Sequence, residues 1–265
     1  MTSVVLINPP VEKINEVWDA PPHGHIGLAY LAAALRQNNI NCSIIDAKLS
    51  RLSFEEVLDS VSTQQPKLIG ITSFSHEINI SATLAAKIKE RIPNSRIVVG
   101  GPHASSLPEE TLRDFRAFDY SVKGEGEHSL VAVAETVINA GNNAIAEIPG
   151  VAYRQSGQIM VTPKADWIKD LDSLQFPAWD LFPKMKVFPV ITSRGCPFKC
   201  VFCARMLGDR VRLRSPQNVT AELQLLKEKF DAKDIVFYDE TFGFHKEWLN
   251  QFFNGLTSTG LNQKI

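Results

Sequence analysis

The sequence contains little that is typical of a secreted, membrane-spanning or nucleic-acid-binding protein. Four cysteines in 265 residues are too few for a disulfide-stapled secreted fold. The 28 Lys and Arg nearly balance the 29 Asp and Glu, so no attraction to nucleic acid or to an anionic membrane is indicated. No apolar run approaches the roughly 20 residues of a membrane helix, and Met1 leads into a strand-like segment without a signal-peptide pattern. We therefore expect a cytoplasmic globular protein with no nucleic-acid or membrane partner.

Three of the four cysteines, Cys196, Cys200 and Cys203, are bunched in the segment SRGCPFKCVFCAR, with spacers of three and two residues. Three thiolates in one tight loop can ligate three corners of a [4Fe–4S] cluster, which leaves the fourth iron open to another ligand. The spacing differs from those of bacterial and plant-type ferredoxins. The pattern therefore favours a cluster that binds a substrate or cofactor over one that only passes electrons.

Zinc is the competing interpretation of these cysteines. A structural zinc site takes four protein ligands, and His245 could complete a Cys3His set. The fourth cysteine, Cys42, lies far upstream in an apolar segment. Because no second cysteine pair follows the first, the pattern favours cluster ligation.

The first half of the chain alternates short β-branched runs with helical patterns, which predicts a parallel α/β sheet. Five strands with crossover helices favour a flavodoxin-like doubly wound domain, in which ligands bind beyond the carboxyl ends of the strands. The expected strands are 4–8, 42–46, 68–72, 97–100 and 120–122.

Small and polar residues collect at these carboxyl ends. Glycines there let the backbone approach a large ligand, although a glycine after a strand can also simply form a tight turn. Because several such loops meet at one edge, a binding site is predicted. The segments are NPP at 8–10, Asp46, TSFS at 72–75, GGPH at 100–103 and KGEGE at 123–127.

The second half begins with a predicted hairpin at 148–162 and a connector that is rich in proline and aromatic residues. We expect these aromatic side chains to pack between the two parts of the chain. Further along we expect strands at 187–192 and 234–238, helices at 219–230 and around 248–253, and a polar tail from Gly255. The predicted divisions are residues 1–142, a connector at 143–183, and a second domain at 184–265.

The run CPFKCVFC resembles the CxxxCxΦC signature of radical S-adenosylmethionine enzymes, with Phe202 as the aromatic residue. The first half resembles the cobalamin-binding domain that precedes many such cores, through NPP, PHGHIGLAYLAAALR, VGGPHASSLPEE and VKGEGE. The segments IPGVAYRQSGQI and LDSLQFPAWDLFP continue the pattern. The resemblance implies a flavodoxin-like cobalamin-binding domain followed by the first β/α units of an incomplete radical SAM (β/α) barrel. The implied cofactors are a [4Fe–4S] cluster, S-adenosylmethionine and cobalamin.

The resemblance also implies site residues. The cysteine triad would be the cluster ligands, and Phe202 with the acidic pair of YDETF, Asp239 and Glu240, would lie beside S-adenosylmethionine. The D-x-H-x-x-G motif, whose histidine binds cobalt in other cobalamin proteins, does not occur. The implied cobalamin contacts are Pro9, Thr72, Ser73, Gly100, Gly101, His103, Gly124, Glu125 and Gly126.

Several of these residues have simpler structural interpretations. His23 and His25 could line the same pocket, but for His25 a hydrogen bond to backbone or solvent is favoured. Glu125 and Glu127 could instead interact with a helix dipole, and Asp239 could cap the following helix. The arginines after the cysteines could balance the charge of a cluster, or form a solvated basic face: Arg205, Arg210, Arg212 and Arg214.

The resemblance implies methyl transfer to an unactivated carbon, or a related radical rearrangement or cyclisation, on a small-molecule substrate, with an electron donor for the cluster. Only the opening β/α units of a barrel are expected, so either the chain is a fragment of a longer protein or the second half of the barrel comes from another chain. A truncated core could bind cobalamin and lack turnover. The alternative is a non-catalytic corrinoid-binding module with a vestigial cluster loop. A flavodoxin-like domain that binds another ligand beside a zinc loop is the third possibility.

Overall fold

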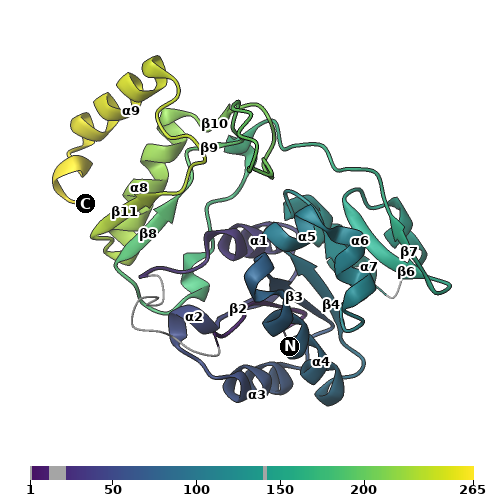
Figure 1. The fold of residues 1–265 in the computed structure, drawn as a ribbon. Helices are drawn as coiled ribbons and strands as arrows, with labels where there is room; N and C mark the ends of the chain where they lie inside the picture. The colour runs from purple at the N-terminus through teal and green to yellow at the C-terminus, as the bar shows by residue number, and fades with distance from the viewer. Residues whose placement is uncertain (1, 12–21, 140–141) are drawn as a thin grey trace.

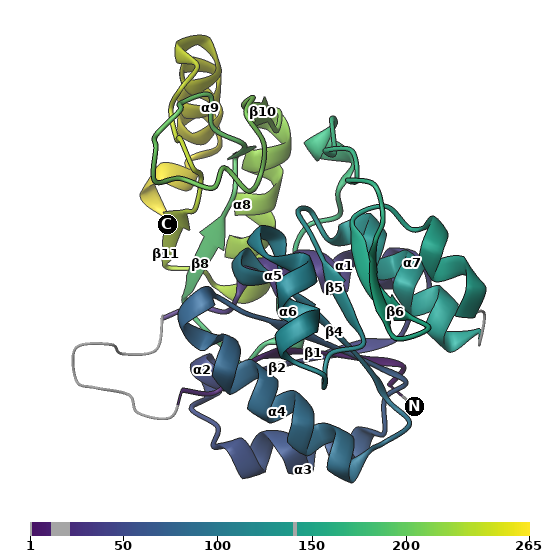
Figure 2. The same cartoon turned by 45° about the vertical axis from the view of Figure 1, so that its right-hand side comes forward.

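The computed structural model describes residues 2–11, 22–139 and 142–265. Two α/β parts lie side by side, joined by a connector, as Figures 1 and 2 show from two directions. The first part is built on a seven-stranded sheet of order β2-β1-β3-β4-β5-β6-β7, in which the first five strands are parallel. Its strands are β1 Val4–Asn8, β2 Cys42–Asp46, β3 Leu68–Thr72, β4 Arg96–Gly100, β5 Tyr120–Val122, β6 Val151–Gln155 and β7 Gln158–Val161.

The predicted flavodoxin-like strand order is confirmed, and the apolar strands are buried on both faces because helices cover each side of the sheet. Val4 and Leu6 of β1 pack toward α1 and α7, whereas the alternate residues Val5 and Ile7 pack toward α3 and α4. The helices of this part are α1 Ile26–Gln37, α2 Ala47–Ser50, α3 Phe54–Gln64, α4 Ile78–Arg91, α5 Pro102–Ser106, α6 Pro108–Asp114 and α7 Glu127–Ile138.

The predicted hairpin forms as β6 and β7, with its turn at Ser156-Gly157. The structure adds that β6 pairs antiparallel with β5, so the hairpin extends the sheet at its edge. The predicted division at residue 142 therefore falls within a stretch that still completes the first part. Short 3-10 turns lie between the longer elements: η1 Ser75–Glu77, η2 Asn142–Glu147, η3 Leu171–Ser173, η4 Trp179–Leu181 and η5 Leu261–Gln263.

The second part contains two parallel strands, β8 Val187–Val190 and β11 Asp234–Phe237, with the helices α8 Pro216–Phe230 and α9 Lys246–Thr259. A short antiparallel pair, β9 Ser193–Arg194 and β10 Arg212–Leu213, closes the base of the segment that carries the cysteines. We call this segment, residues 195–211, the cysteine loop.

The prediction of a polar tail from Gly255 is wrong, because α9 continues to Thr259. Gly255 allows α9 to approach α8: a Cβ at this position would lie 3.3 Å from Oγ1 of Thr220. Leu261 is buried, and Gly260 ends the helix with a positive φ of 67°. The last residues are thus part of the packed structure.

The aromatic connector packs between the two parts, as predicted. Trp179 is 2% exposed and contacts Phe182 and Phe188, with ring centroids 5.2 and 5.8 Å away. These rings belong to the same apolar cluster as α1 of the first part and α8 of the second. No helix in the described ranges combines the length and the apolar character needed to cross a membrane.

Candidate functional site

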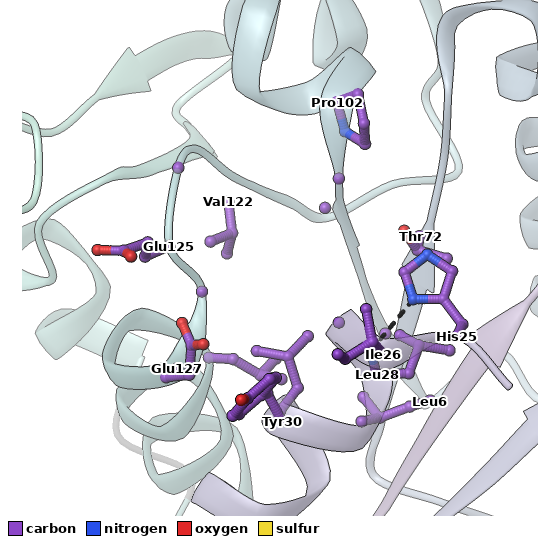
Figure 3. A pocket seen from close by; sticks show the side chains of 18 of the residues that line it. Leu6, His25, Ile26, Leu28, Tyr30, Thr72, Pro102, Val122, Glu125 and Glu127 are labelled. Carbon is purple, nitrogen blue, oxygen red and sulfur yellow. Dashed lines mark hydrogen bonds between the residues drawn. The ribbon is translucent and has the colours of Figure 1, made fainter. Parts of the chain in front are cut away.

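A cavity of about 480 Å³ lies at the carboxyl ends of β1, β3, β4 and β5, beside the first turns of α1. Figure 3 shows His25 and Thr72 on one side of it, with Glu125 and Glu127 on the other. Its lining is largely apolar, with a few polar groups, as is common for sites that bind a large cofactor. The edge of the sheet predicted from the sequence is therefore the edge that is hollowed.

The floor of the cavity is shaped by three residues in register on adjacent strands: Leu6, Gly70 and Val98. A Cβ at Gly70 would come within 2.8 Å of Cδ2 of Leu6. A glycine inside a strand often marks such a close approach. Here its missing side chain makes room for the side chain of Leu6, which forms part of the floor.

The loop after β4 forms one wall, and its two glycines have different roles. A Cβ on Gly100 would have no heavy atom within 4 Å, so this residue opens onto free space. Gly101 has φ of 89°, and a Cβ there would lie 2.8 Å from Oγ1 of Thr72. Gly101 therefore fits the two loops together, while Gly100 leaves room for a ligand.

His25 caps α1 at the cavity wall. Its Nδ1 accepts a hydrogen bond from the backbone N–H of Leu28 at 3.3 Å, so the predicted backbone interaction is confirmed. Burial lowers the pKa of His25, which favours the neutral ring. With Nδ1 as the acceptor, the neutral ring carries its hydrogen on Nε2, so it offers one donor.

Six of the predicted cobalamin contacts line the cavity: Thr72, Gly100, Gly101, Gly124, Glu125 and Gly126. Pro9, Ser73 and His103 are not among the lining residues. The backbone N–H of His103 donates to the carbonyl of Ser73, and its Nδ1 lies 3.1 Å from Oγ of Ser75. These contacts hold His103 in the loop, where burial lowers its pKa.

The second part of the chain supplies the rest of the cavity wall, through Ile191, Arg194, Leu207 and Tyr238. Arg194 lies two residues before Cys196, and Leu207 belongs to the cysteine loop itself. The cavity is therefore shared between the doubly wound sheet and the segment that carries the cysteines.

A buried network of charges joins these two walls. Arg194 bonds Glu125 at 3.0 Å and Glu127 at 2.7 Å, and Arg212 bonds Glu125 at 2.9 Å. Burial alone raises the pKa of Glu125, but the hydrogen bond from Arg212 and the charge of Arg194 outweigh it and lower the pKa. Glu125 thus remains a carboxylate, and its contact with a cofactor remains a prediction.

The interpretation of the arginines as a solvated basic face is wrong for Arg212 and Arg214. Arg214 is 3% exposed and pairs with buried Glu222. Arg205 is half-buried and Arg210 is exposed. For Arg212 the sequence could not show this, because its carboxylate partner Glu125 lies 87 residues away.

The cysteine loop starts at Gly195, whose φ is 91°. A Cβ there would lie 2.2 Å from the carbonyl oxygen of Arg210, so only glycine fits between the two ends of the loop. Cys200 and Cys203 are exposed, and Cys196 is partly buried. Phe202 is 90% exposed, and its predicted contact with S-adenosylmethionine stays a prediction.

Two polar contacts reach the sulfur atoms of the loop. Oγ1 of Thr241 donates to Sγ of Cys196 at 3.3 Å, and the backbone N–H of Arg205 donates to Sγ of Cys203 at 3.5 Å. Such donors stabilise thiolate sulfur in iron–sulfur proteins, so the donor set fits a cluster. In the described part of the chain, no three His, Cys, Asp or Glu side chains are gathered as metal ligands. This holds for the cysteine triad and for the alternative Cys3His set with His245 alike, so both ligand sets stay predictions.

The acidic pair follows β11. One carboxylate oxygen of Asp239 accepts hydrogen bonds from the backbone and the hydroxyl of both Thr192 and Ser193, which links β11 to the start of the cysteine loop. The alternative that Asp239 caps the next helix is wrong. Its other oxygen is buried without a partner, and burial raises the pKa of both Asp239 and Glu240.

Sequence reasoning missed several residues of the cavity, chiefly Leu6, Gly70 and Val98 of the floor. Gly70 carried a usable signal, because it interrupts an otherwise apolar strand, LIGIT. The contribution of Arg194, Leu207 and Tyr238 to the cavity could not be predicted, since it depends on how the two parts pack.

Comparisons with known proteins agree with this geometry. Residues 20–134 match the family model described as B12 binding domain. The chain is 32% identical over 256 residues to an uncharacterised methyltransferase of Pyrococcus horikoshii, covering 92% of this chain and 54% of that protein. It is 27% identical to the anaerobic magnesium-protoporphyrin IX monomethyl ester cyclase of Cereibacter sphaeroides, covering 90% of this chain and 41% of that protein.

A solved structure shares the fold of nearly all of this chain. It is OxsB, a cobalamin-dependent S-adenosylmethionine radical enzyme solved with aqua-cobalamin and S-adenosylmethionine bound. The TM-score is 0.82 at 21% identity, over 96% of this chain and 37% of OxsB. The chain spans about half or less of the length of each of these proteins. The chain therefore contains a B12-binding domain over residues 20–134, and it shares its fold with a cobalamin-dependent S-adenosylmethionine radical enzyme.

Proposed function

We propose that this chain binds cobalamin in the cavity and a [4Fe–4S] cluster with S-adenosylmethionine at the cysteine loop, as the cofactor-binding part of a methyltransferase. The observation that carries the proposal is the shared wall of the cavity. Glycine-rich loops of the doubly wound sheet form one side, and Arg194 and Leu207 of the cysteine segment form the other. A corrinoid held there would lie against the segment that carries the thiols.

The cavity suits the corrinoid through its shape and lining. The open space at Gly100 admits bulky groups, and the apolar floor excludes water. The Nε2 hydrogen of His25 and the hydroxyl of Thr72 are available to amide or phosphate oxygens of a ligand. These residues would bind and orient the cofactor.

The thiolates of Cys196, Cys200 and Cys203 would hold the cluster, with Asp239 and Glu240 next to it as acceptors for S-adenosylmethionine. Cobalamin supplies a transferable methyl group when bound, and the cluster with S-adenosylmethionine supplies a radical that abstracts hydrogen. Thr241 and the N–H of Arg205 would stabilise thiolate charge through their bonds to sulfur.

The substrate we propose is a small molecule, methylated at an unactivated carbon. Methyl transfer is favoured over cyclisation because the 32% identical relative is described as a methyltransferase. An electron donor would approach the exposed side of the loop at Cys200 and Cys203. The four free thiols suit the reducing cytoplasm, where we propose that the protein works.

The test is anaerobic reconstitution of the chain with iron, sulfide and hydroxocobalamin, followed by counting iron, zinc and corrinoid. We expect about four irons for a [4Fe–4S] cluster, with one corrinoid per chain. Replacing the three cysteines of the loop by alanine should remove the iron and leave the corrinoid. Gly100→Leu, which fills open space in the cavity, should weaken corrinoid binding about tenfold or more and leave the iron.

Two outcomes would contradict the proposal. Bound zinc without iron or corrinoid would overturn both cofactor assignments. Unchanged corrinoid binding in Gly100→Leu would show that the corrinoid does not bind in this cavity. Gly100→Ala is the matched control, because its methyl group meets no neighbour and occupies little of the space.

A further inference from the structure

One carboxylate, that of Glu125, holds both sides of the base of the cysteine loop. Arg194 and Arg212 face each other in the β9–β10 pair, so the loop leaves and returns between them. Both guanidinium groups bond Glu125, at 3.0 Å from Arg194 and 2.9 Å from Arg212. Glu125 therefore contacts both ends of the loop, whereas Glu127 contacts only one of them, through Arg194.

The same carboxylate also ties the connector to this base. Oε2 of Glu125 accepts a hydrogen bond from the backbone N–H of Ile168 at 2.8 Å. Arg212 in turn donates to the carbonyl oxygen of Leu207 within the loop at 2.7 Å. Loss of Glu125 would leave Glu127 as the remaining carboxylate paired with Arg194 and would free Arg212 from this anchor.

Burial makes this arrangement rigid. The Glu125 side chain is 3% exposed, and those of Arg194 and Arg212 are 6% and 13% exposed. Removing one member of such a buried group leaves uncompensated charge, which is strongly destabilising. The base of the loop therefore has little freedom while Glu125 is present.

Glu125, Arg194 and Leu207 also line the cavity. A ligand in the cavity would therefore contact Glu125, Arg194 at the base of the loop and Leu207 within the loop. If the ligand binds one loop conformation more tightly, it stabilises that conformation. Fixing the loop in that conformation must then raise the affinity for the ligand by the same factor, because coupling between two sites is reciprocal.

We propose that Glu125 is a positioning residue that couples occupancy of the cavity to the conformation of the cysteine loop. Ligand binding in the cavity then slows reactions of the loop thiols. When the cysteines are fixed by metal ligation, the cavity binds its ligand more tightly. This inference rests on the proposed function in one respect, namely that the cavity ligand is a corrinoid.

The test measures alkylation by iodoacetamide in the iron-free chain, with peptide mass spectrometry to follow Cys196, Cys200 and Cys203 separately. The probe is cyanocobalamin, because its cyanide ligand hinders direct bonding of cobalt to a thiol. We expect cyanocobalamin to slow alkylation of the loop about fivefold or more in the wild-type chain. For Glu125→Gln the affinity for cyanocobalamin is measured first, and at a saturating concentration of cyanocobalamin we expect no such protection.

Buried Cys42 is the internal reference for folding, because it reacts only if the first part opens. Asp180→Asn is the matched control: it breaks an exposed ion pair between the connector and Arg36 of α1, and protection should remain as in wild type. If Glu125→Gln exposes Cys42, the variant Arg212→Gln, which removes one arm of the anchor, decides the question by the same measurement.

The outcomes separate the two proposals. Absence of corrinoid binding to the wild-type chain would overturn the proposed function, and this inference with it. Binding without protection in the wild type, or equal protection in Glu125→Gln, would overturn the inference and leave the proposed function standing.

Discussion

The hydroxyl of Tyr238 donates a hydrogen bond to Nε2 of His23 over 2.7 Å, and the two rings meet edge to face with centroids 5.0 Å apart. The direction follows from the other ring nitrogen, because Nδ1 lies 3.2 Å from the carbonyl oxygen of Gly24, which can only accept. His23 belongs to the loop before α1, and Tyr238 follows β11 next to Asp239. The pair therefore joins the loop before α1 to the end of β11, where the acidic residues Asp239 and Glu240 follow.

A double-mutant cycle should measure this connection. We expect Tyr238→Phe and His23→Gln each to lower the free energy of unfolding, with a coupling energy of about 1 kcal/mol between them. Urea unfolding followed by fluorescence gives the four values. A coupling energy near zero would mean that the bond contributes nothing to holding the two parts together.

Gly195→Ala should disrupt the cysteine loop, because its Cβ would collide with the carbonyl oxygen of Arg210. After reconstitution we expect this variant to retain well under half of the wild-type iron. Gly157→Ala is the control: its φ of 83° is similarly positive, but a Cβ there has open space. The control should lose only about 1–2 kcal/mol of stability and keep its iron, and equal iron in both variants would refute the steric explanation.

The contribution of Glu125 to stability should disappear in acid. Its pKa in the folded chain is lowered from the ordinary 4.5, so the stabilisation is present above pH 4.5 and is lost as the pH falls through the folded value. At pH 7 we expect Glu125→Gln to be less stable by about 3 kcal/mol. The difference in unfolding free energy from wild type should shrink below pH 4.5, and a pH-independent difference would argue against the assigned charge.

Arg214→Met should be among the most destabilising single changes in the second part. The Arg214 side chain pairs with Glu222, whose pKa is raised by burial. The backbone carbonyl oxygen of Arg214 accepts a hydrogen bond from the indole N–H of Trp248 at 2.6 Å. Without the guanidinium, Glu222 is left unpaired in the interior, at a cost of about 3–5 kcal/mol. Thermal and urea unfolding measure this loss.

Exposed Arg91 provides the comparison for that experiment. It pairs with Glu55 and Asp59, whose side chains are 63% and 73% exposed. Arg91→Met should lower the free energy of unfolding much less than Arg214→Met does, because water replaces the lost partner. Similar losses in the two variants would show that burial does not set the strength of the Arg214 pair.

The sequence predicted the sheet well because its strands are short apolar runs whose burial on both faces is visible in composition alone. Leu68–Thr72, for example, was predicted with the bounds that the structure has. The edge of the sheet that binds a ligand follows from parallel pairing, so Thr72, Gly100 and Gly124 could be chosen in advance.

Features that depend on packing between distant segments could not be predicted. Glu125 was expected to face a ligand or a helix dipole, yet its partners Arg194 and Arg212 lie 69 and 87 residues later. The end of α9 was missed for the same reason. Its polar residues gave no helical pattern, and the close packing of Gly255 against α8 could not be predicted from them. Local pattern carries no information about which charges or surfaces meet across the chain.

The apolar cluster that runs through the connector has a consequence for how this chain can change over time. Leu28 of α1, Trp179 of the connector and Leu226 of α8 share one interior. Recombination that joins the first part to the second part of a distant relative would bring together side chains of mismatched volume, which close-packed interiors tolerate poorly. The two parts are therefore expected to be inherited as a pair, and functional chimeras should require exchange of the connector and its facing residues together.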